Sequence, residues 1–552
     1  MIKIVNRYLF FLLALSLTPL ELILAQTSPS LNFSEFNIPF GDLGEPTATM
    51  LVTPDNQNLF FRVFESPSRA AIYRTLVSDP SEVERVSVAS NANSLIGADF
   101  RFVMNSSGSH VLYTVQAGAQ NQAQLYSYNI TTRQNIRLSS IDNTTRPRFE
   151  LNKAGDHVVF IEQDLNTNTG RLLTAPIDGS ALARELATTD IGQTFGTSFL
   201  DGDLFIANDS QRVLYYVESG DGDLRDLYSV NLEGSPIPLK LNSIASIEGE
   251  EVERLQLFSN DTRVAYRATG TNTPSNLFSV PVDGSSEPRQ VSEEQTTLFG
   301  VRAQNWFIDS QEQRIIYTVG STSNAKLLSS SLALPLNHIR LDSDANPVSN
   351  FGLLKQILQT NDVAYVSENP PDSDLFDLYT IDSSGGTAQK INSDSTEISN
   401  TYFGNGSTFL YTRQQRNTAD DRQFQLVKYD AMTGQSEVLS STRPYPTLFS
   451  SQFILSPNEN FIYLLSNLGA QNQFDMLQIS LTGDNRVTKV NRNIANNSSI
   501  DLNTIVVNDS LIVYRVLSPD GDNTQYFANR DNGNSSFFVL KAVNGNTIVI
   551  SL

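Results

Sequence analysis

Apolar and polar positions alternate in a pattern that returns along almost the whole chain. The clearest copy spans residues 453–466: an apolar segment ends at Leu455, a polar turn follows over residues 456–460, and a second apolar segment contains Tyr463. Short apolar runs bounded by turn residues are typical of β-strands. Self-similarity at a fixed period is the signature of a repeat architecture. The pattern therefore predicts repeated pairs of strands.

Ten copies of this strand–turn–strand unit can be aligned, the first at residues 50–63. In the other nine, the second strand carries an aromatic residue at one position: Tyr113, Phe160, Tyr215, Tyr266, Tyr317, Tyr365, Tyr411, Tyr463 and Tyr514. Successive members of this series are 46 to 55 residues apart. Such regularity argues against a mosaic of unrelated domains.

Two further elements follow each unit. The third is apolar and alternating, as in residues 226–234 and 276–284, and ends in a turn pair such as Asp283-Gly284, which is a hairpin signal. The fourth is shorter and more polar, as in residues 288–291, and a polar strand protects an exposed sheet edge. Four short antiparallel strands per period describe a propeller blade. The expected fold class is all-β, a β-propeller of about ten four-stranded blades.

The ten repeats can form one ring or two smaller rings in tandem. We favour a single ring over residues 45–552, because the rhythm has no clear break; the longer gap before Tyr215 and the shortened seventh unit are the candidate seams. Closing a ring would pair a strand from one terminus with a blade begun at the other. The segments available for this are residues 33–40 and 546–552.

Composition and charge restrict the partners. Hydrophobic residues make up 39% and charged residues 18% of the chain, which is ordinary for a folded protein. The net charge is -21, and such a balance repels nucleic acid and anionic membrane surfaces. Cysteine is absent, which excludes disulfides, thiolate zinc sites, a cysteine nucleophile and a lipoprotein anchor.

The first residues have the pattern of a secretory signal peptide. Lys3 and Arg7 precede a largely apolar stretch, and Ala25 offers a cleavage site before Gln26. We expect residues 1–25 to be removed and residues 26–44 to form a leader with a possible closing strand. The mature protein would then be periplasmic or secreted, without a membrane span. The alternative is an uncleaved membrane anchor, although the stretch is only marginally long enough to span a bilayer.

The turn motif resembles a known repeat. Ser456-Pro457-Asn458 before an apolar strand, Thr53-Pro54-Asp55 in the first copy, and a later Asp-Leu-Tyr are similar to the TolB-like or WD40-like (PD40) propeller repeat, although most copies depart from its Ser-Pro-Asp-Gly form. The resemblance covers about residues 45 to 540. It implies an exported propeller that acts as a binding scaffold. Related propellers also cap prolyl-oligopeptidase-type hydrolases, but no Gly-x-Ser-x-Gly elbow occurs here.

Few residues are candidates for a functional site, and none forms a catalytic constellation. His110 and His157 occupy equivalent turn positions, where blade symmetry would place them on one rim, although either can be a plain polar turn residue. Trp306, the only tryptophan, is a core residue or an anchor in a binding surface.

Acidic clusters are more numerous. Asp221, Asp223 and Asp226 have oxygen ligands of the kind that calcium takes, but lack the EF-hand spacing. The competing interpretation is that these acids are ordinary polar residues of surface turns. No cofactor other than calcium is expected.

These observations lead to two hypotheses. The first is a non-enzymatic exported scaffold that binds a protein, peptide or glycan of the cell envelope or exterior. The alternative is a hydrolase or lyase acting on carbohydrate or peptide through carboxylates in the propeller channel. An enzyme would bring several carboxylates with perturbed pKa values together in one pocket, whereas a scaffold would scatter them over turns.

Overall fold

The computed structural model places most of the repeat region. It describes residues 34–37, 46–66, 69–76, 83–88, 102–116, 123–140, 148–164, 169–190, 193–195, 204–207, 211–218, 224–242, 251–270, 273–294, 300–321, 324–343, 348, 355–357, 360–368, 376–392, 397–403, 408–418, 421–439, 453–456, 460–466, 475–481, 487–489, 499–507, 512–517, 524–529, 538–543 and 546–551. No helix that could cross a membrane occurs among these residues.

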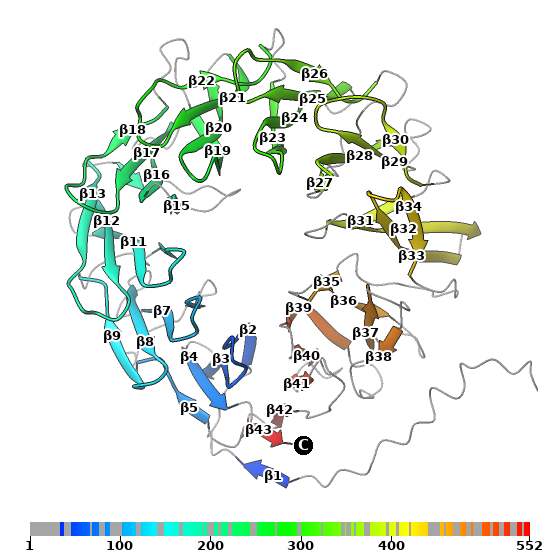
Figure 1. Cartoon of the computed structure of the whole chain (residues 1–552). Coiled ribbons are helices and arrows are strands. Elements are labelled where there is room, and N and C mark those ends of the chain that lie inside the picture. The colour runs from blue at the N-terminus through cyan, green and yellow to red at the C-terminus, as the bar shows by residue number, and fades with distance from the viewer. Residues whose placement is uncertain are drawn as a thin grey trace, which may run out of the picture.

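The described strands form ten antiparallel sheets that follow one another around a single ring (Figure 1). This confirms the all-β propeller that the repeat pattern predicts. We number these sheets as blades 1 to 10 in chain order.

Blades 1 to 3 consist of β2 (Pro46–Val52), β3 (Asn58–Ser66), β4 (Arg69–Leu76) and β5 (Val83–Arg85); β6 (Phe102–Met104), β7 (His110–Gln116), β8 (Ala123–Asn129) and β9 (Gln134–Arg137); and β10 (Arg148–Leu151), β11 (His157–Asp164), β12 (Thr169–Pro176) and β13 (Arg184–Thr188). Blades 4 to 6 consist of β14 (Thr194–Phe195), β15 (Leu204–Ala207), β16 (Arg212–Glu218), β17 (Arg225–Asn231) and β18 (Leu239–Lys240); β19 (Glu251–Phe258), β20 (Arg263–Gly270), β21 (Thr273–Pro281) and β22 (Arg289–Gln290); and β23 (Val301–Ile308), β24 (Arg314–Ser321), β25 (Asn324–Ser331) and β26 (His338–Arg340).

Blades 7 to 9 consist of β27 (Lys355–Ile357), β28 (Asp362–Glu368), β29 (Phe376–Asp382) and β30 (Gln389–Lys390); β31 (Glu397–Phe403), β32 (Thr408–Thr418), β33 (Asp421–Asp430) and β34 (Gln435–Val438); and β35 (Phe453–Leu455), β36 (Phe461–Ser466), β37 (Asp475–Ser480) and β38 (Val487–Lys489). Blade 10 consists of β39 (Ser499–Val507), β40 (Ile512–Leu517), β41 (Thr524–Asn529), β42 (Phe538–Val543), β43 (Asn546–Ser551) and β1 (Ser34–Asn37).

Both candidate seams of the sequence have a local explanation. In blade 4, β14 and β15 both pair with β16, so the longer gap before Tyr215 holds an additional short strand. The shortened seventh unit still forms a four-stranded sheet, with a first strand of only three residues, β27. Neither feature interrupts the ring in Figure 1.

Hydrophobic cores lie between neighbouring blades. One core cluster joins Phe258, Ala265 and Leu277 of blade 5 to Ile315 and Tyr317 of blade 6. A blade therefore buries its two faces only by stacking against copies of itself, and the second and third strands are apolar on both faces. Several fourth strands face solvent: both residues of β30 and all four residues of β34 are exposed.

Blade 10 differs from the expected four-stranded pattern, because its sheet has six strands. Its outermost pair is antiparallel β43 and β1, with Ser34 opposite Ser551. These strands come from the two segments that the sequence offered for closure. On the inner side, β2 of blade 1 and β39 of blade 10 contact each other. The ring is therefore closed at its inner and outer radius by different contacts.

Candidate functional site

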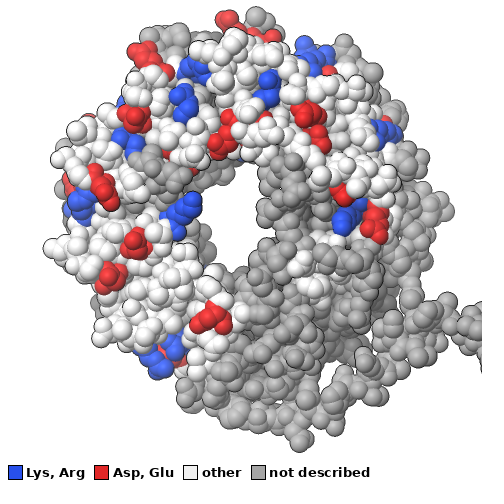
Figure 2. Space-filling view, viewed as in Figure 1, with Lys and Arg blue, Asp and Glu red and all other residues white. Residues whose placement is uncertain are grey.

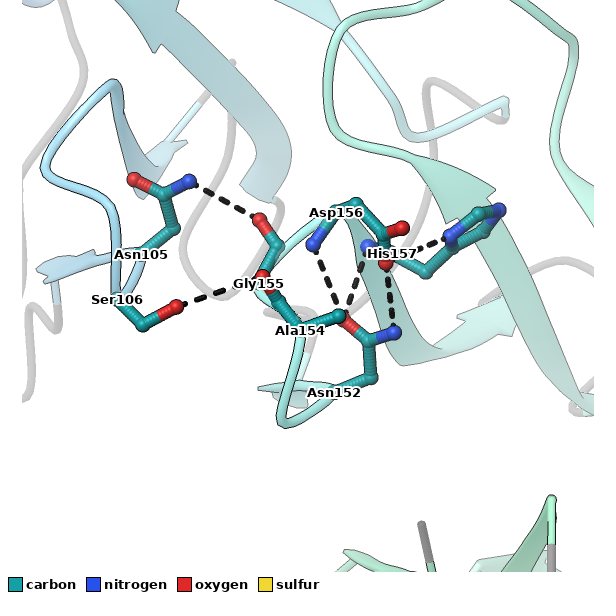
Figure 3. Close-up of polar contacts among 7 residues, drawn as sticks. All are labelled: Asn105, Ser106, Asn152, Ala154, Gly155, Asp156 and His157. Carbon is teal, nitrogen blue, oxygen red and sulfur yellow. Dashed lines mark hydrogen bonds and ion pairs between the residues drawn. The ribbon is translucent and has the colours of Figure 1, made fainter. Parts of the chain in front are cut away.

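We call the turn between the first and second strand of a blade the first turn. In blades 2, 3 and 6 this turn is held by its own leading side chain. In blade 3, Asn152 Oδ1 accepts hydrogen bonds from the backbone N–H of Asp156 at 3.1 Å and of His157 at 3.0 Å (Figure 3). Asn105 does the same in blade 2, and Asp309 in blade 6. Short polar side chains favour such local bonds, which explains why the repeat begins its turn with Asn, Asp, Ser or Thr.

First turns of neighbouring blades are bonded to each other. Asn105 Nδ2 of blade 2 donates to the carbonyl of Gly155 of blade 3 at 3.0 Å, and Ser106 Oγ donates to the carbonyl of Ala154 at 3.4 Å (Figure 3). Gly155 has φ +71°, and a Cβ there would lie 2.8 Å from Ser106 Oγ. The first turns of blades 2 and 3 thus lie side by side at one rim of the ring.

His110 and His157, the two histidines that the sequence singled out, begin β7 and β11 at this rim. His110 is buried; its Nδ1 lies 2.9 Å from Ser109 Oγ and its Nε2 lies 3.1 Å from Asn129 Nδ2. Burial lowers the pKa of His110, and Asp178 of the next blade opposes that effect. His157 is exposed and pairs with Asp156 at 3.0 Å. The structure therefore places both residues at one rim, each bonded to its own turn.

The rim continues beyond these two residues as a row of basic side chains, which we call the basic row. It consists of the first residue of the second strand in five successive blades: His110, His157, Arg212, Arg263 and Arg314. The arginine members were not among the candidate residues expected from the sequence. The signal that marks them is a basic residue at the turn together with a serine in the third strand.

Each arginine of the basic row is bonded to that serine. Arg212 Nε donates to Ser229 Oγ at 2.6 Å, and Arg314 Nε donates to Ser329 Oγ at 2.6 Å. Arg263 donates to Ser279 Oγ from Nε at 3.3 Å and from Nη2 at 3.2 Å. Burial is the main cause that lowers the pKa of all three guanidiniums. These cations consequently sit between blades and keep their charge in a partly dry environment.

The carboxylates with shifted pKa values are spread over separate turns. Hydrogen bonds from Ser180 and Ser285 lower the pKa of Asp178 and Asp283 respectively, and those from His157 and Asn152 lower the pKa of Asp156. Burial raises the pKa of Asp362 at the start of β28, where Asp382 adds repulsion. Three of these four groups stabilise the turn in which they lie.

Asp226 belongs to the structure of its blade. Its Oδ1 lies 2.7 Å from Lys240 Nζ in an ion pair and accepts a hydrogen bond from Asn242 Nδ2 at 3.1 Å. Asp377 of blade 7 pairs with Lys390 in the same way, at 2.7 Å. Asp221 and Asp223 lie outside the described residues. Among the described residues, no group of three or more potential ligands is arranged to hold a metal ion.

Trp306 lies in the core between blades 5 and 6. Its side chain is 1% exposed, and the guanidinium of Arg254 stands 5.0 Å from its ring centroid in a cation–π contact. The indole therefore contributes to packing between blades and does not reach the surface of the ring.

A channel passes through the centre of the ring (Figure 2). Acidic and basic side chains are interspersed on the face that this view shows. The first strands of the blades lie innermost (Figure 1), and one of them, β19, carries Glu251, Glu253 and Arg254. Glu253 pairs with Arg267 of β20, and burial lowers the pKa of Arg267 to about 10.

Blade 3 holds a fully buried carboxylate that has a charged partner. Glu162 is 0% exposed and accepts hydrogen bonds from Ser140 N at 2.7 Å, Ser140 Oγ at 3.0 Å and Arg171 Nη2 at 2.6 Å. A buried charge is tolerated when it is paired and hydrogen-bonded in this manner. Since these bonds tie the incoming chain to β11 and β12, the group has a structural role in blade 3.

Comparison with known proteins gives matches in structure alone. Dipeptidyl peptidase 4 from Porphyromonas gingivalis aligns at TM-score 0.45 and 12% identity, over 78% of this chain and 65% of that one. A prolyl endopeptidase aligns at TM-score 0.34 and 11% identity, over 70% of this chain and 54% of that one. An oligogalacturonate lyase in complex with manganese aligns at TM-score 0.33 and 10% identity, over 82% of this chain and 96% of that one. This chain spans less than two thirds of either peptidase. No family model and no curated sequence matches.

Proposed function

We propose that this chain is an exported, non-enzymatic β-propeller that binds a protein, peptide or glycan ligand of the cell envelope or exterior. In this proposal the repeats are a divergent form of the TolB-like PD40 repeat. Residues 1–25 direct export and are removed, residues 26–44 are a leader that carries the closing strand β1, and residues 45–552 form the blades. The mature protein then resides in the periplasm or outside the cell.

The proposal rests on one observation: the side chains with shifted pKa values are bonded within their own turns and blades. Asp156 and Asp178 lie on two separate turns of blade 3 and Asp283 lies on a turn of blade 5. Each is occupied by hydrogen bonds within its own turn. The arginines of the basic row are likewise tied to serines of their own blades. A scaffold needs charged groups that fix its loops, whereas a catalytic site needs several of them in one cavity.

The ring also suits the presentation of a binding surface. Successive blades from 1 to 9 share hydrophobic cores, such as the cluster between blades 5 and 6. This packing makes the framework rigid. Loops at the two faces are then free to vary without loss of the fold, and binding residues concentrate on such loops. A ligand would bind at one rim or in the central channel.

Binding and turnover by the purified mature chain test the proposal. The chain is offered to a peptide display library and a glycan array, and each hit is measured by calorimetry and then incubated with the protein at 37 °C and analysed by mass spectrometry. Saturable binding of an intact ligand supports a scaffold. Cleavage of a peptide or polysaccharide hit would overturn the proposal in favour of a hydrolase or lyase with carboxylates in the channel.

A further inference from the structure

Acidic residues accompany the basic row on the turn between the third and fourth strand, which we call the third turn. Four residues after the third-strand Thr or Ser, blades 3, 4 and 5 carry Asp178, Glu233 and Asp283. The position faces the preceding blade: Asp178 attracts His110 of blade 2, and Asp283 attracts Arg212 of blade 4. In blade 6 the same position, four residues after Ser329, is Ala333.

The seam between blades 5 and 6 therefore lacks the acid that its neighbours have. On the blade 5 side it has two arginines. Arg289 is the register partner of Ser279, and Arg263 donates to Ser279 Oγ at 3.2 Å. Because side chains alternate between the faces of a strand, Arg263, Ser279 and Arg289 share one face of the sheet. Arg289 Nη2 donates to the carbonyl of Leu332, so this face is turned toward blade 6.

The positive charge of this pair is not balanced within the part of the chain that the structure describes. Neither Arg263 nor Arg289 has an ion-pair partner there, and the buried Nε of Arg289 has no acceptor. Burial is the main cause that lowers the pKa of Arg263, and the positive charge of Arg289 lowers it further, while Asp283 raises it. Asp283 is thus one carboxylate for Arg263 and Arg212 together, in a protein whose net charge is -21.

An apolar side chain stands beside the missing acid. Leu334 is 71% exposed, and its loop is held in shape by Ser331, whose Oγ donates to the carbonyl of Ala333 at 2.8 Å and accepts from the backbone N–H of Asn337 at 3.1 Å. A fixed loop that presents an apolar side chain next to unneutralised guanidiniums has the two elements that recognise an acidic residue flanked by an apolar one.

We propose that the seam between blades 5 and 6 binds a peptide carboxylate, with Arg263 and Arg289 as its cations and Leu334 as its apolar contact. The ligand supplies the carboxylate that blade 6 lacks at Ala333. This inference rests on the proposed function, because it names the ligand class of the scaffold. A peptide fits better than an acidic glycan, since a glycan offers no side chain for Leu334.

The test uses the mature chain and the probe peptide acetyl-Gly-Gly-Leu-Glu-Gly-Gly-amide. Its Gln counterpart removes only the charge, and digalacturonate provides the acidic glycan arm. By calorimetry we expect the Glu peptide to bind at least tenfold more tightly than the Gln peptide and digalacturonate. Equal binding of the two peptides, or no binding of either, would overturn the inference, and preferential binding of digalacturonate would overturn the assignment to a peptide.

A second test uses a variant that supplies the missing carboxylate from the chain itself. Such a variant removes no contact, so a loss of binding cannot be attributed to unfolding. Ala333→Asp places a carboxylate on an exposed position, so we expect an unchanged or higher Tm and at least a tenfold loss of peptide affinity. Ser384→Asp adds the same charge at the equivalent position of blade 7, where Asp382 already attracts Arg314, and should leave peptide affinity within about twofold. Unchanged affinity in Ala333→Asp refutes the site. A library ligand that binds wild type and Ala333→Asp alike would keep the scaffold proposal while refuting this one.

Discussion

At the scale of single residues, a side-chain oxygen holds the first turn in blades 2, 3 and 6. Asp309 shows the strongest case, because it is 2% exposed and accepts four hydrogen bonds. Two come from the backbone of its own turn, and two come from Asn361 Nδ2 at 3.2 Å and Ser383 Oγ at 3.0 Å in blade 7. One carboxylate therefore shapes a turn and joins two blades.

Replacing this carboxylate should be costly. We expect Asp309→Ala to lower the free energy of unfolding by about 3 kcal/mol, because it leaves several buried donors without an acceptor. Urea unfolding followed by fluorescence measures the change. The control is Asp55→Ala, in an exposed turn where Asp55 accepts bonds from Thr53 Oγ1 and Gln57 N, with an expected loss of about 1 kcal/mol or less. Equal losses for the two variants would contradict the interpretation.

Asp362 is a residue whose charge works against the fold. It lies directly opposite Asp382 in the register of β28 and β29, and burial raises its pKa above the ordinary value of 3.8. A carboxyl group with a raised folded-state pKa destabilises the protein when ionised. That cost is present at neutral pH and disappears as the pH falls through the folded-state pKa to below 3.8.

Asp362→Asn should therefore stabilise the protein at pH 7 by about 0.5 kcal/mol, the order expected for relief of like charges across a strand pair. The gain should vanish at pH 3, where the Asp362 carboxyl group, whose pKa is raised, is protonated. Denaturant unfolding at the two pH values measures it. Asp382→Asn is the contrasting variant, since Asp382 also accepts a bond from Ser384 N at 2.7 Å, and we expect it to lose stability at pH 7. A loss in Asp362→Asn at pH 7 would show that its charge is needed.

At the scale of elements, the first turns act as contacts between blades as well as connections between strands. Gly155 in the first turn of blade 3 can be compared with Gly234 in the third turn of blade 4. Both have φ +71°, but only Gly155 has a neighbour in the way of a Cβ. Ser106 Oγ would lie 2.8 Å from a Cβ at Gly155, whereas nothing lies within 4 Å of a Cβ at Gly234.

We expect Gly234→Ala to cost about 1 kcal/mol, the price of a left-handed conformation for a residue with a Cβ. Gly155→Ala should cost about 1 to 2 kcal/mol more, since it adds a clash with the turn of blade 2. Thermal and urea unfolding compare the two variants. If their losses are the same, the contact between turns does not contribute to stability.

The elements also show how far sequence reasoning reaches. The aromatic series through Tyr463 predicted the blades, because its period depends only on which residues are buried. The arginines of the basic row and the absence of an acid at Ala333 could not be interpreted in this way. Their charge environment depends on which turn of the next blade faces them. From the repeat alignment His110 and His157 are expected at equivalent turn positions on one rim, and the bonds that each makes there could be seen only once the turns were placed. Trp306 and Asp226 could each be interpreted in two ways until their neighbours were placed.

At the scale of the whole molecule, the ring has two separate closures. Packing of β2 against β39 joins the first and last blades at the inner radius, and pairing of β1 with β43 joins the chain ends at the outer radius. The leader that carries β1 is the segment that we expect to follow the cleaved signal peptide. Export and ring closure thus concern neighbouring parts of the sequence.

Cleavage should leave Gln26 as the first residue of the mature protein. Mass spectrometry of the protein recovered from the periplasm or medium of an expressing Gram-negative host measures this, because cleavage after Ala25 follows the small-residue rule of signal peptidase. Ala25→Arg should block processing and leave the precursor in the membrane fraction, while Ala14→Val, within the apolar stretch, should be processed normally. Recovery of an intact precursor from wild-type cells would favour the uncleaved anchor.

The antiparallel pairing of β1 with β43 places Ser34 beside Ser551. Whatever is covalently joined to either end of the ring, such as a tether, a tag or another folded unit, would depart from the same point on its outer circumference. Both faces of the ring and its central channel would then remain accessible, because the attachment lies on the outer edge. A permuted chain with these two ends joined by a short linker and opened in a distant loop should consequently fold to the same ring.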